Sequence, residues 1–71
     1  MEKKKLEFVV FLIHALAEAW NQSNVRVYQV LNETGILDNY IISFYDVLHT
    51  LDKQYLVEDI TDFVKEKSVM I

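Results

Sequence analysis

The sequence predicts an all-α fold, a compact bundle of about four helices in a single domain spanning residues 1–71. Apolar residues recur at spacings of three and four along most of the chain, which is the period of helices with a buried face. The chain contains no Pro and a single Gly, so few positions interrupt a helix. Hydrophobic residues make up 52% of the chain, which suffices for a packed core and excludes disorder. We expect helices over approximately residues 3–21, 24–33, 38–52 and 58–67.

The first predicted helix, residues 3–21, is apolar on nearly all sides. Its centre reads FVVFLIHALA from Phe8 to Ala17, and only His14 in this run is polar. Because successive residues turn by about 100° around a helix, the apolar side chains divide into two opposite faces. The face expected in the core holds Leu6, Val9, Val10, Ile13, Leu16, Ala17 and Trp20.

The opposite face of this helix predicts association with a second molecule. A helix that is apolar on both faces must be covered on both, and a small chain has few elements with which to cover it. We therefore expect a homo-oligomer, with a dimer favoured. The expected interface consists of Phe8, Phe11, Leu12, Ala15, Ala19, Ile42 and Tyr45. Helix geometry identifies two apolar faces without deciding which one the other helices cover, so the reverse assignment stays open.

Local signals bound the second predicted helix, residues 24–33. Ser23 can accept a hydrogen bond from a free backbone N–H at the start of this helix. Gly35 follows its end, where a residue without a Cβ adopts the left-handed conformation at little cost. The side chains expected to point inward are Val27, Val30, Leu31 and Thr34.

The third predicted helix begins after Asp38, its expected N-cap, and ends near Asp52. Residues at helical spacing define its expected core face, which consists of Leu37, Tyr40, Ile41, Phe44, Val47, Leu48 and Leu51. A second and shorter ridge is formed by Ile42, Tyr45 and His49.

The fourth predicted helix spans residues 58–67. Residues 55–60 begin with Tyr-Leu-Val, which favours a strand, but a lone strand would have no partner here. Ile60, Phe63 and Val64 are expected to pack inward. Acidic residues near the start of this segment and lysines near its end complement the helix dipole, which favours the helix.

The sequence shows no catalytic or metal-binding pattern, so we expect neither an enzyme nor a bound cofactor or metal. There is no Cys, and His14 and His49 lack the spacing of a metal motif such as HExxH. Tyr45 and His49 lie one helical turn apart, but an acid–base pair also needs a pocket and a nucleophile.

A membrane or secreted location is not expected. The apolar run is about half of the ~20 residues that cross a bilayer. Lysines before this run resemble the start of a signal peptide, but cleavage at Ala15 or Ala17 would remove a core helix. We therefore expect a cytoplasmic protein.

Polar residues on the third predicted helix permit two interpretations. Asp46, His49 and Thr50, together with Tyr45, can present a recognition edge to a partner. They can equally form a structural hydrogen-bond network with the following loop, which is the interpretation we favour, because buried polar groups need partners.

The central pair of helices also suggests a second class of function. A helix, a Gly-containing turn and a helix over residues 23–51 resemble a helix-turn-helix, so a dimeric DNA-binding regulator is the alternative. The net charge of -4 and the single arginine, Arg26, argue against this reading, because DNA-binding surfaces are basic. Nucleic acid is therefore not the favoured partner.

Residues 23–68 carry a resemblance to a known family. Within SNVRVYQVLNETGILDNYIISFYDVLHTLDKQYLVEDITDFVKEKS, the segments YDVLHTL (45–51) and LVEDI (56–60) are the most distinctive. The chain resembles a family of short, uncharacterised bacterial all-helical proteins with the pattern VYxxLNxTGxLDNYI, YDxLHT and YxVEDIxxFV. The resemblance implies ADP-ribosyltransferase-like toxins, whose genes are associated with this family, as a partner class.

The resemblance implies no catalytic residue. From the apolar surface of the first helix we expect a non-enzymatic interaction module that self-associates, and the resemblance adds the binding or neutralisation of an ADP-ribosyltransferase-like partner. The tail is a departure from the family pattern, which often stops at a glycine after the last lysine. Here the chain continues with Ser68, Val69, Met70 and Ile71, for which docking on the body and free extension are both open.

Overall fold

Residues 2–67, the part of the chain that the computed structural model describes, form five helical segments. In chain order these are α1 (Lys3–Trp20), α2 (Asn24–Glu33), the π-helix η1 (Leu37–Ile42), α3 (Tyr45–Leu48) and α4 (Lys53–Glu66). This described part contains no strand, so the predicted all-α bundle is confirmed. The tail singled out above, residues 68–71, lies outside the described residues.

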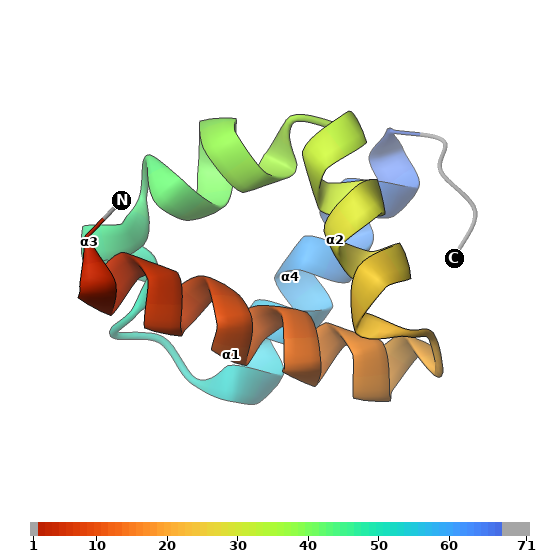
Figure 1. The fold of residues 1–71 in the computed structure, drawn as a ribbon, viewed down its shortest axis with the longest axis horizontal. Coiled ribbons are helices and arrows are strands. Elements are labelled where there is room, and N and C mark those ends of the chain that lie inside the picture. Colours follow the sequence, from red (N-terminus) through yellow and green to blue (C-terminus); the bar gives the residue numbers. More distant parts are fainter. Residues whose placement is uncertain (1, 68–71) are drawn as a thin grey trace.

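The elements wrap around one core (Figure 1). Helix α1 runs lengthwise, α2 crosses near its C-terminal end, η1 returns toward the start of α1, and α4 lies behind. Helix α1 contacts both α2 and α4. Fully buried side chains from these elements fill the centre, and the largest are Leu12, Leu16, Leu31, Ile36, Ile41, Leu56 and Ile60.

The buried face of α1 differs from the predicted one. Val9, Leu12 and Leu16 lie at its centre, and Leu12 has no exposed surface. Leu6 and Val10, which were expected in the core, are exposed. Two neighbours, α2 and α4, cover α1 from different sides, so the buried arc takes residues from both apolar faces of the sequence.

Helix α2 has the predicted bounds and the predicted caps. The hydroxyl oxygen of Ser23 accepts a hydrogen bond of 3.1 Å from the backbone N–H of Arg26. Gly35 follows with φ +78°, the left-handed conformation that ends the helix. Val27, Val30 and Leu31 are buried as expected.

The third predicted helix is divided in two. The hydroxyl of Ser43 donates a hydrogen bond of 2.8 Å to the carbonyl of Asp38, five residues earlier, which matches the wide turn of η1. Phe44 then leaves the helical region at φ -107°, and α3 starts at Tyr45. The wide turn rotates the residues that follow, so Phe44, Val47 and Leu51 are exposed and their predicted burial was wrong.

Helix α4 begins five residues before its predicted start at Glu58. Asp52 is its N-cap, with a side-chain oxygen that accepts a hydrogen bond of 3.1 Å from the N–H of Gln54. Asp38, predicted as an N-cap, instead lies within η1. Leu56, Ile60 and Val64 form the buried seam of α4 at a spacing of four residues.

Candidate functional site

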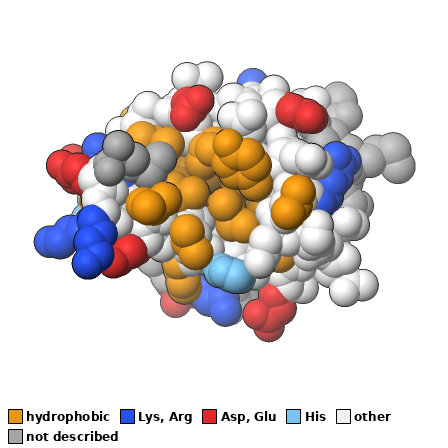
Figure 2. Space-filling view, viewed as in Figure 1, with side chains coloured by type: hydrophobic (Ala, Val, Ile, Leu, Met, Phe, Trp, Pro, Cys, Tyr) orange, Lys and Arg blue, Asp and Glu red, His pale blue; other side chains and the backbone are white. Residues whose placement is uncertain are grey.

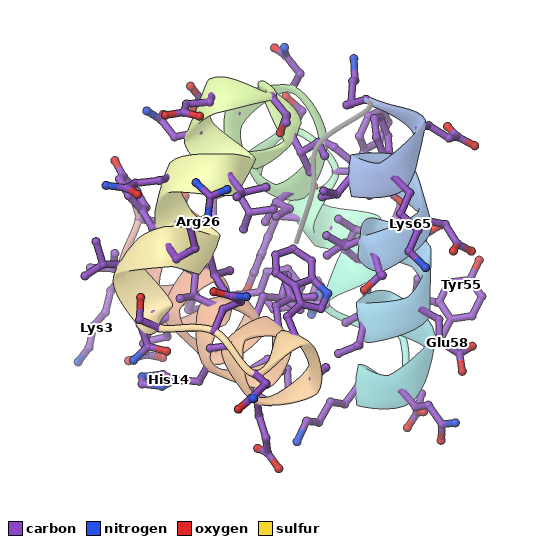
Figure 3. All side chains as sticks on the ribbon, turned by 90° about the vertical axis from the view of Figure 1, so that its right-hand side faces the viewer. Lys3, His14, Arg26, Tyr55, Glu58 and Lys65 are labelled. Atoms are coloured by element: carbon purple, nitrogen blue, oxygen red, sulfur yellow. The ribbon has the colours of Figure 1, made fainter. Side chains whose placement is uncertain are left out.

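An apolar hollow lies between α1 and α2. Its volume is about 320 Å³, and its lining consists of Val10, Ile13, His14, Asn24, Val25 and Tyr28. Figure 2 shows hydrophobic side chains gathered in the middle of this face of the molecule, with charged groups around the edge. In Figure 3, His14 projects from α1 on the side away from α4. A concave apolar surface with a polar edge has the form of a binding site.

The helix boundaries place the apolar residues of this hollow on the surface. Val10 lies on the exposed side of α1, and Leu6, one turn before it on the same side, is exposed but outside the lining. Because Ser23 fixes the start of α2, Val25 falls in its first turn and Tyr28 follows on the same side. All four side chains are exposed, and the exposed fraction of Val25 is 66%. Apolar side chains gathered on an exposed surface are candidates for contact with another molecule.

The lining of the hollow contains no carboxylate, lysine or arginine, although the whole chain has a net charge of -4. A partner can therefore cover this surface without burying an unpaired carboxylate, lysine or arginine. Burial of such a charge costs free energy because the charge loses its contact with water. Tyr28 and Asn24 supply polar groups that can hydrogen-bond at the edge.

Comparison with known proteins gives the family of this chain. The sequence profile of the family described as "Protein of unknown function (DUF3791)" matches residues 7–67. The chain belongs to the DUF3791 family. The match includes every residue that lines the hollow between α1 and α2. No curated protein and no solved structure shows significant similarity to it.

Two of the seven residues of the expected interface of this DUF3791 protein are buried inside the protomer, and three more are half-buried. Leu12 and Ala15 are buried, so a partner has no access to them and their assignment to the interface was wrong. Phe8 and Tyr45 contact each other instead, with ring centroids 5.4 Å apart and an interplanar angle of 76°. Ile42 packs partly buried against the core.

Phe11 and Ala19 are the two members of the expected interface that are exposed. Ala19 borders a second hollow, between α1 and α4, whose lining includes Glu18, Lys53 and Glu58. The lining of this second hollow contains acidic and basic side chains, whereas the lining of the hollow beside α2 contains no Asp, Glu, Lys or Arg. The exposed apolar surface of α1 therefore lies next to α2, and not on the side of α1 that holds Phe11 and Ala19.

The predicted polar residues make local contacts. The ring of His49 stacks on Tyr45 at 4.7 Å, and the hydroxyl of Thr50 donates a hydrogen bond of 2.7 Å to the carbonyl of Val47. Asp46 is exposed at the start of α3. The stack and the hydrogen bond each join neighbours along the chain, and they hold the segment that leads into α4.

Residues 2–67 contain neither a cluster of metal ligands nor a membrane-spanning helix. No three His, Asp or Glu side chains in this range come together as metal ligands, and no helix in it is long and apolar enough to cross a membrane.

Tyr40 has a raised pKa. Burial raises the pKa of Tyr40 to about 12, with further contributions from its hydrogen bond to Asp59 and the nearby charge of Asp59. A phenol with this pKa keeps its proton at neutral pH.

Sequence reasoning missed Val25 and Tyr28, which form the α2 side of the hollow. A signal was present in the sequence. The two residues are three positions apart and lie off the inward set of Val27, Val30 and Leu31, so a ten-residue helix carries an apolar pair on its outer side. Such a pair indicates a contact surface outside the core.

Proposed function

We propose that this DUF3791 protein is a non-enzymatic interaction module that self-associates through the hollow between α1 and α2. The observation that carries the proposal is the concave and apolar character of this surface, whose lining contains no Asp, Glu, Lys or Arg, on an otherwise acidic chain. Val10, Val25 and Tyr28 are its exposed apolar lining residues, and Leu6 lies one turn before Val10 on the same side of α1.

The absence of Asp, Glu, Lys and Arg from the lining of the hollow favours a second copy as its occupant. In a two-fold symmetric contact the same surface patch is used by both protomers, so charged residues near the axis meet their own counterparts. The outer side of α4 carries Glu58, Asp62 and Glu66 and would repel itself. The hollow beside α2 has no such repulsion among its lining residues.

Shape and size also support self-association. Val25 and Tyr28 lie on the surface of α2 beside the hollow, and side chains of one helix pair commonly pack into the groove of another. A stable interface buries about 800 Å² on each partner. That is roughly one sixth of the 4703 Å² accessible surface of this chain, an area that two helices and their edges can supply.

We further propose that the assembled protein binds and neutralises an ADP-ribosyltransferase-like enzyme. Support for this partner class comes from the sequence resemblance, which associates the family with genes for such toxins. Isothermal titration of the enzyme encoded beside a family gene tests it, with heat released on binding as the expected result and no heat as the contrary one.

DNA binding is the less favoured alternative. The helix expected to read the bases, residues 38–52, is interrupted after η1 by Ser43 and Phe44. Asp38 and Asp46 are exposed on this segment, where their carboxylates would repel phosphate groups.

Sedimentation equilibrium of two matched variants tests the self-association. Val25 and Val47 are helical valines with exposed fractions of 66% and 59%, and only Val25 borders the hollow. We expect Val25→Glu to be monomeric with its helical circular dichroism intact, and Val47→Glu to associate as the wild type does. A monomeric wild type at about 100 µM, well above the Kd of a specific dimer, or equal behaviour of the two variants would overturn the proposal.

A further inference from the structure

A third hollow lies between η1 and the C-terminal half of α4, and aromatic rings form its walls. Its volume is about 190 Å³, which fits a single side chain rather than a larger ligand. The ring of Tyr40 lies 5.7 Å from that of Phe44 and 5.1 Å from that of Phe63, centroid to centroid. The exposed fraction of Phe44 is 52%, so one wall is open to solvent.

The chain already places one of its own cations at these rings. The ammonium nitrogen of Lys67 lies 5.7 Å from the centroid of Phe63, and Lys67 lines the hollow. The face of an aromatic ring carries negative potential and attracts ammonium or guanidinium groups within about 6 Å. The hollow therefore has the chemistry of a cation site, and a flexible surface lysine borders it.

The charges of α4 increase this preference for cations. Helix α4 contains four carboxylates, Glu58, Asp59, Asp62 and Glu66, and two cations, Lys53 and Lys65, so its net charge is -4 + 2 = -2. The carboxylate of Asp59 accepts a hydrogen bond from the hydroxyl of Tyr40, which ties negative charge to one wall of the hollow. A basic segment is attracted to such a surface before it makes contact.

We propose that this aromatic hollow, defined by Tyr40, Phe44 and Phe63, binds an arginine or lysine side chain in a basic segment of a partner protein. Lys67 is the internal cation that the incoming side chain displaces. The site lies on η1 and α4 and shares no lining residue with the hollow between α1 and α2. It therefore stands independently of the self-association proposed above.

Titration of the isotope-labelled full chain with two short peptides, followed by nuclear magnetic resonance of the aromatic rings, tests the site. The probes are acetyl-Gly-Arg-Gly-amide and its neutral counterpart acetyl-Gly-Gln-Gly-amide. The arginine peptide is expected to shift the ring signals of Tyr40, Phe44 and Phe63, and the glutamine peptide to leave them in place.

Two matched pairs of variants separate a cation site from general attraction to an acidic surface. Lys67→Gln and Lys65→Gln change the net charge of the chain equally near the C-terminal end of α4, but only Lys67 lines the hollow. Lys67→Gln is expected to tighten binding of the arginine peptide roughly twofold to fivefold beyond the effect of Lys65→Gln. Phe44→Leu is expected to weaken binding by a similar factor, whereas Tyr55→Leu, which changes an exposed ring outside the lining, leaves it unchanged.

Three results would overturn the proposal. Equal effects of the two lysine variants on peptide affinity would show that the net charge of the protein alone determines binding. Unchanged ring signals with the arginine peptide would show that no arginine side chain binds in the hollow. Nuclear Overhauser contacts from methyl groups of residues 69–71 to Phe44 or Phe63, without a response to the peptide, would assign the hollow to the chain's own end.

Discussion

The indole N–H of Trp20 donates a hydrogen bond of 2.8 Å to the hydroxyl oxygen of Thr61, and the two residues are 41 positions apart. This bond joins the last residue of α1 to the middle of α4. It ties to α4 the end of α1 from which the chain turns into α2.

Loss of the Thr61 hydroxyl is expected to destabilise the fold. Thr61→Val preserves the shape but leaves the partly buried indole N–H without a partner, which lowers the free energy of unfolding by about 1–2 kcal/mol. Urea denaturation followed by the fluorescence of Trp20, the single tryptophan, measures this change. Thr61→Ser keeps the hydroxyl and serves as the control, and an equal loss in both variants would mean that the hydrogen bond contributes nothing.

Neighbouring residues of α1 are expected to respond very differently to truncation. Leu12 has no exposed surface, so Leu12→Ala leaves a cavity and lowers the free energy of unfolding by about 2–5 kcal/mol. Phe11 is 44% exposed, and Phe11→Ala is expected to cost less. Chemical denaturation of both variants measures the loss of free energy of unfolding and shows whether Leu12 lies in the core. A Leu12→Ala protein that is folded and stable but no longer associates would show that Leu12 belongs to the interface.

Stability is expected to fall at alkaline pH because of Tyr40. Burial, the hydrogen bond to Asp59 and the charge of Asp59 raise its pKa from 10.0 to about 12. The folded state thus holds the phenol proton more tightly than the unfolded state, so this contribution to stability is complete below pH 10 and is lost as the pH rises toward 12.

Ultraviolet absorbance of tyrosinate checks the alkaline behaviour of Tyr40. A tyrosine ionisation near pH 12 is expected in the folded protein, and Tyr40→Phe is expected to remove it. A titration curve that Tyr40→Phe leaves unchanged near this pH would contradict the environment described for Tyr40.

Substitution of Gly35 tests the turn between α2 and η1. At φ +78° a residue with a Cβ is strained, and the new atom would lie 3.0 Å from the side-chain nitrogen of Asn39. Gly35→Ala is expected to lower the free energy of unfolding by about 1 kcal/mol. Thermal denaturation in the Asn39→Ala background separates the two causes: an unchanged cost indicates backbone strain, and a reduced cost indicates the steric contact. A fully neutral Gly35→Ala would contradict both.

Sequence signals that act over a few residues predicted the fold well. Ser23 and Gly35 identified both ends of α2, because capping and left-handed turns depend on single residues. The break after η1 has no such signal, since neither Pro nor Gly occurs near Ser43 and Phe44. Asp52 did carry a capping signal for α4, but the β-favouring residues 55–57 obscured it.

The candidate site depended on information that the sequence does not contain. Periodicity showed that α1 has two apolar faces, yet the buried arc was set by where α2 and α4 pack. This arrangement exposed Val10 and buried Leu12, the reverse of the expected order. Val25 and Tyr28 were detectable as an outward apolar pair, but their position beside Val10 required the angle between α1 and α2.

Intermolecular contacts measured on a mixture of isotope-labelled and unlabelled protein test the central claim most directly. An isotope-filtered nuclear Overhauser experiment is expected to show contacts between the ring of Tyr28 in one protomer and the methyl groups of Leu6, Val10 or Val25 in its partner. Absence of intermolecular contacts, or contacts confined to Phe11 and Ala19, would contradict self-association through the hollow between α1 and α2.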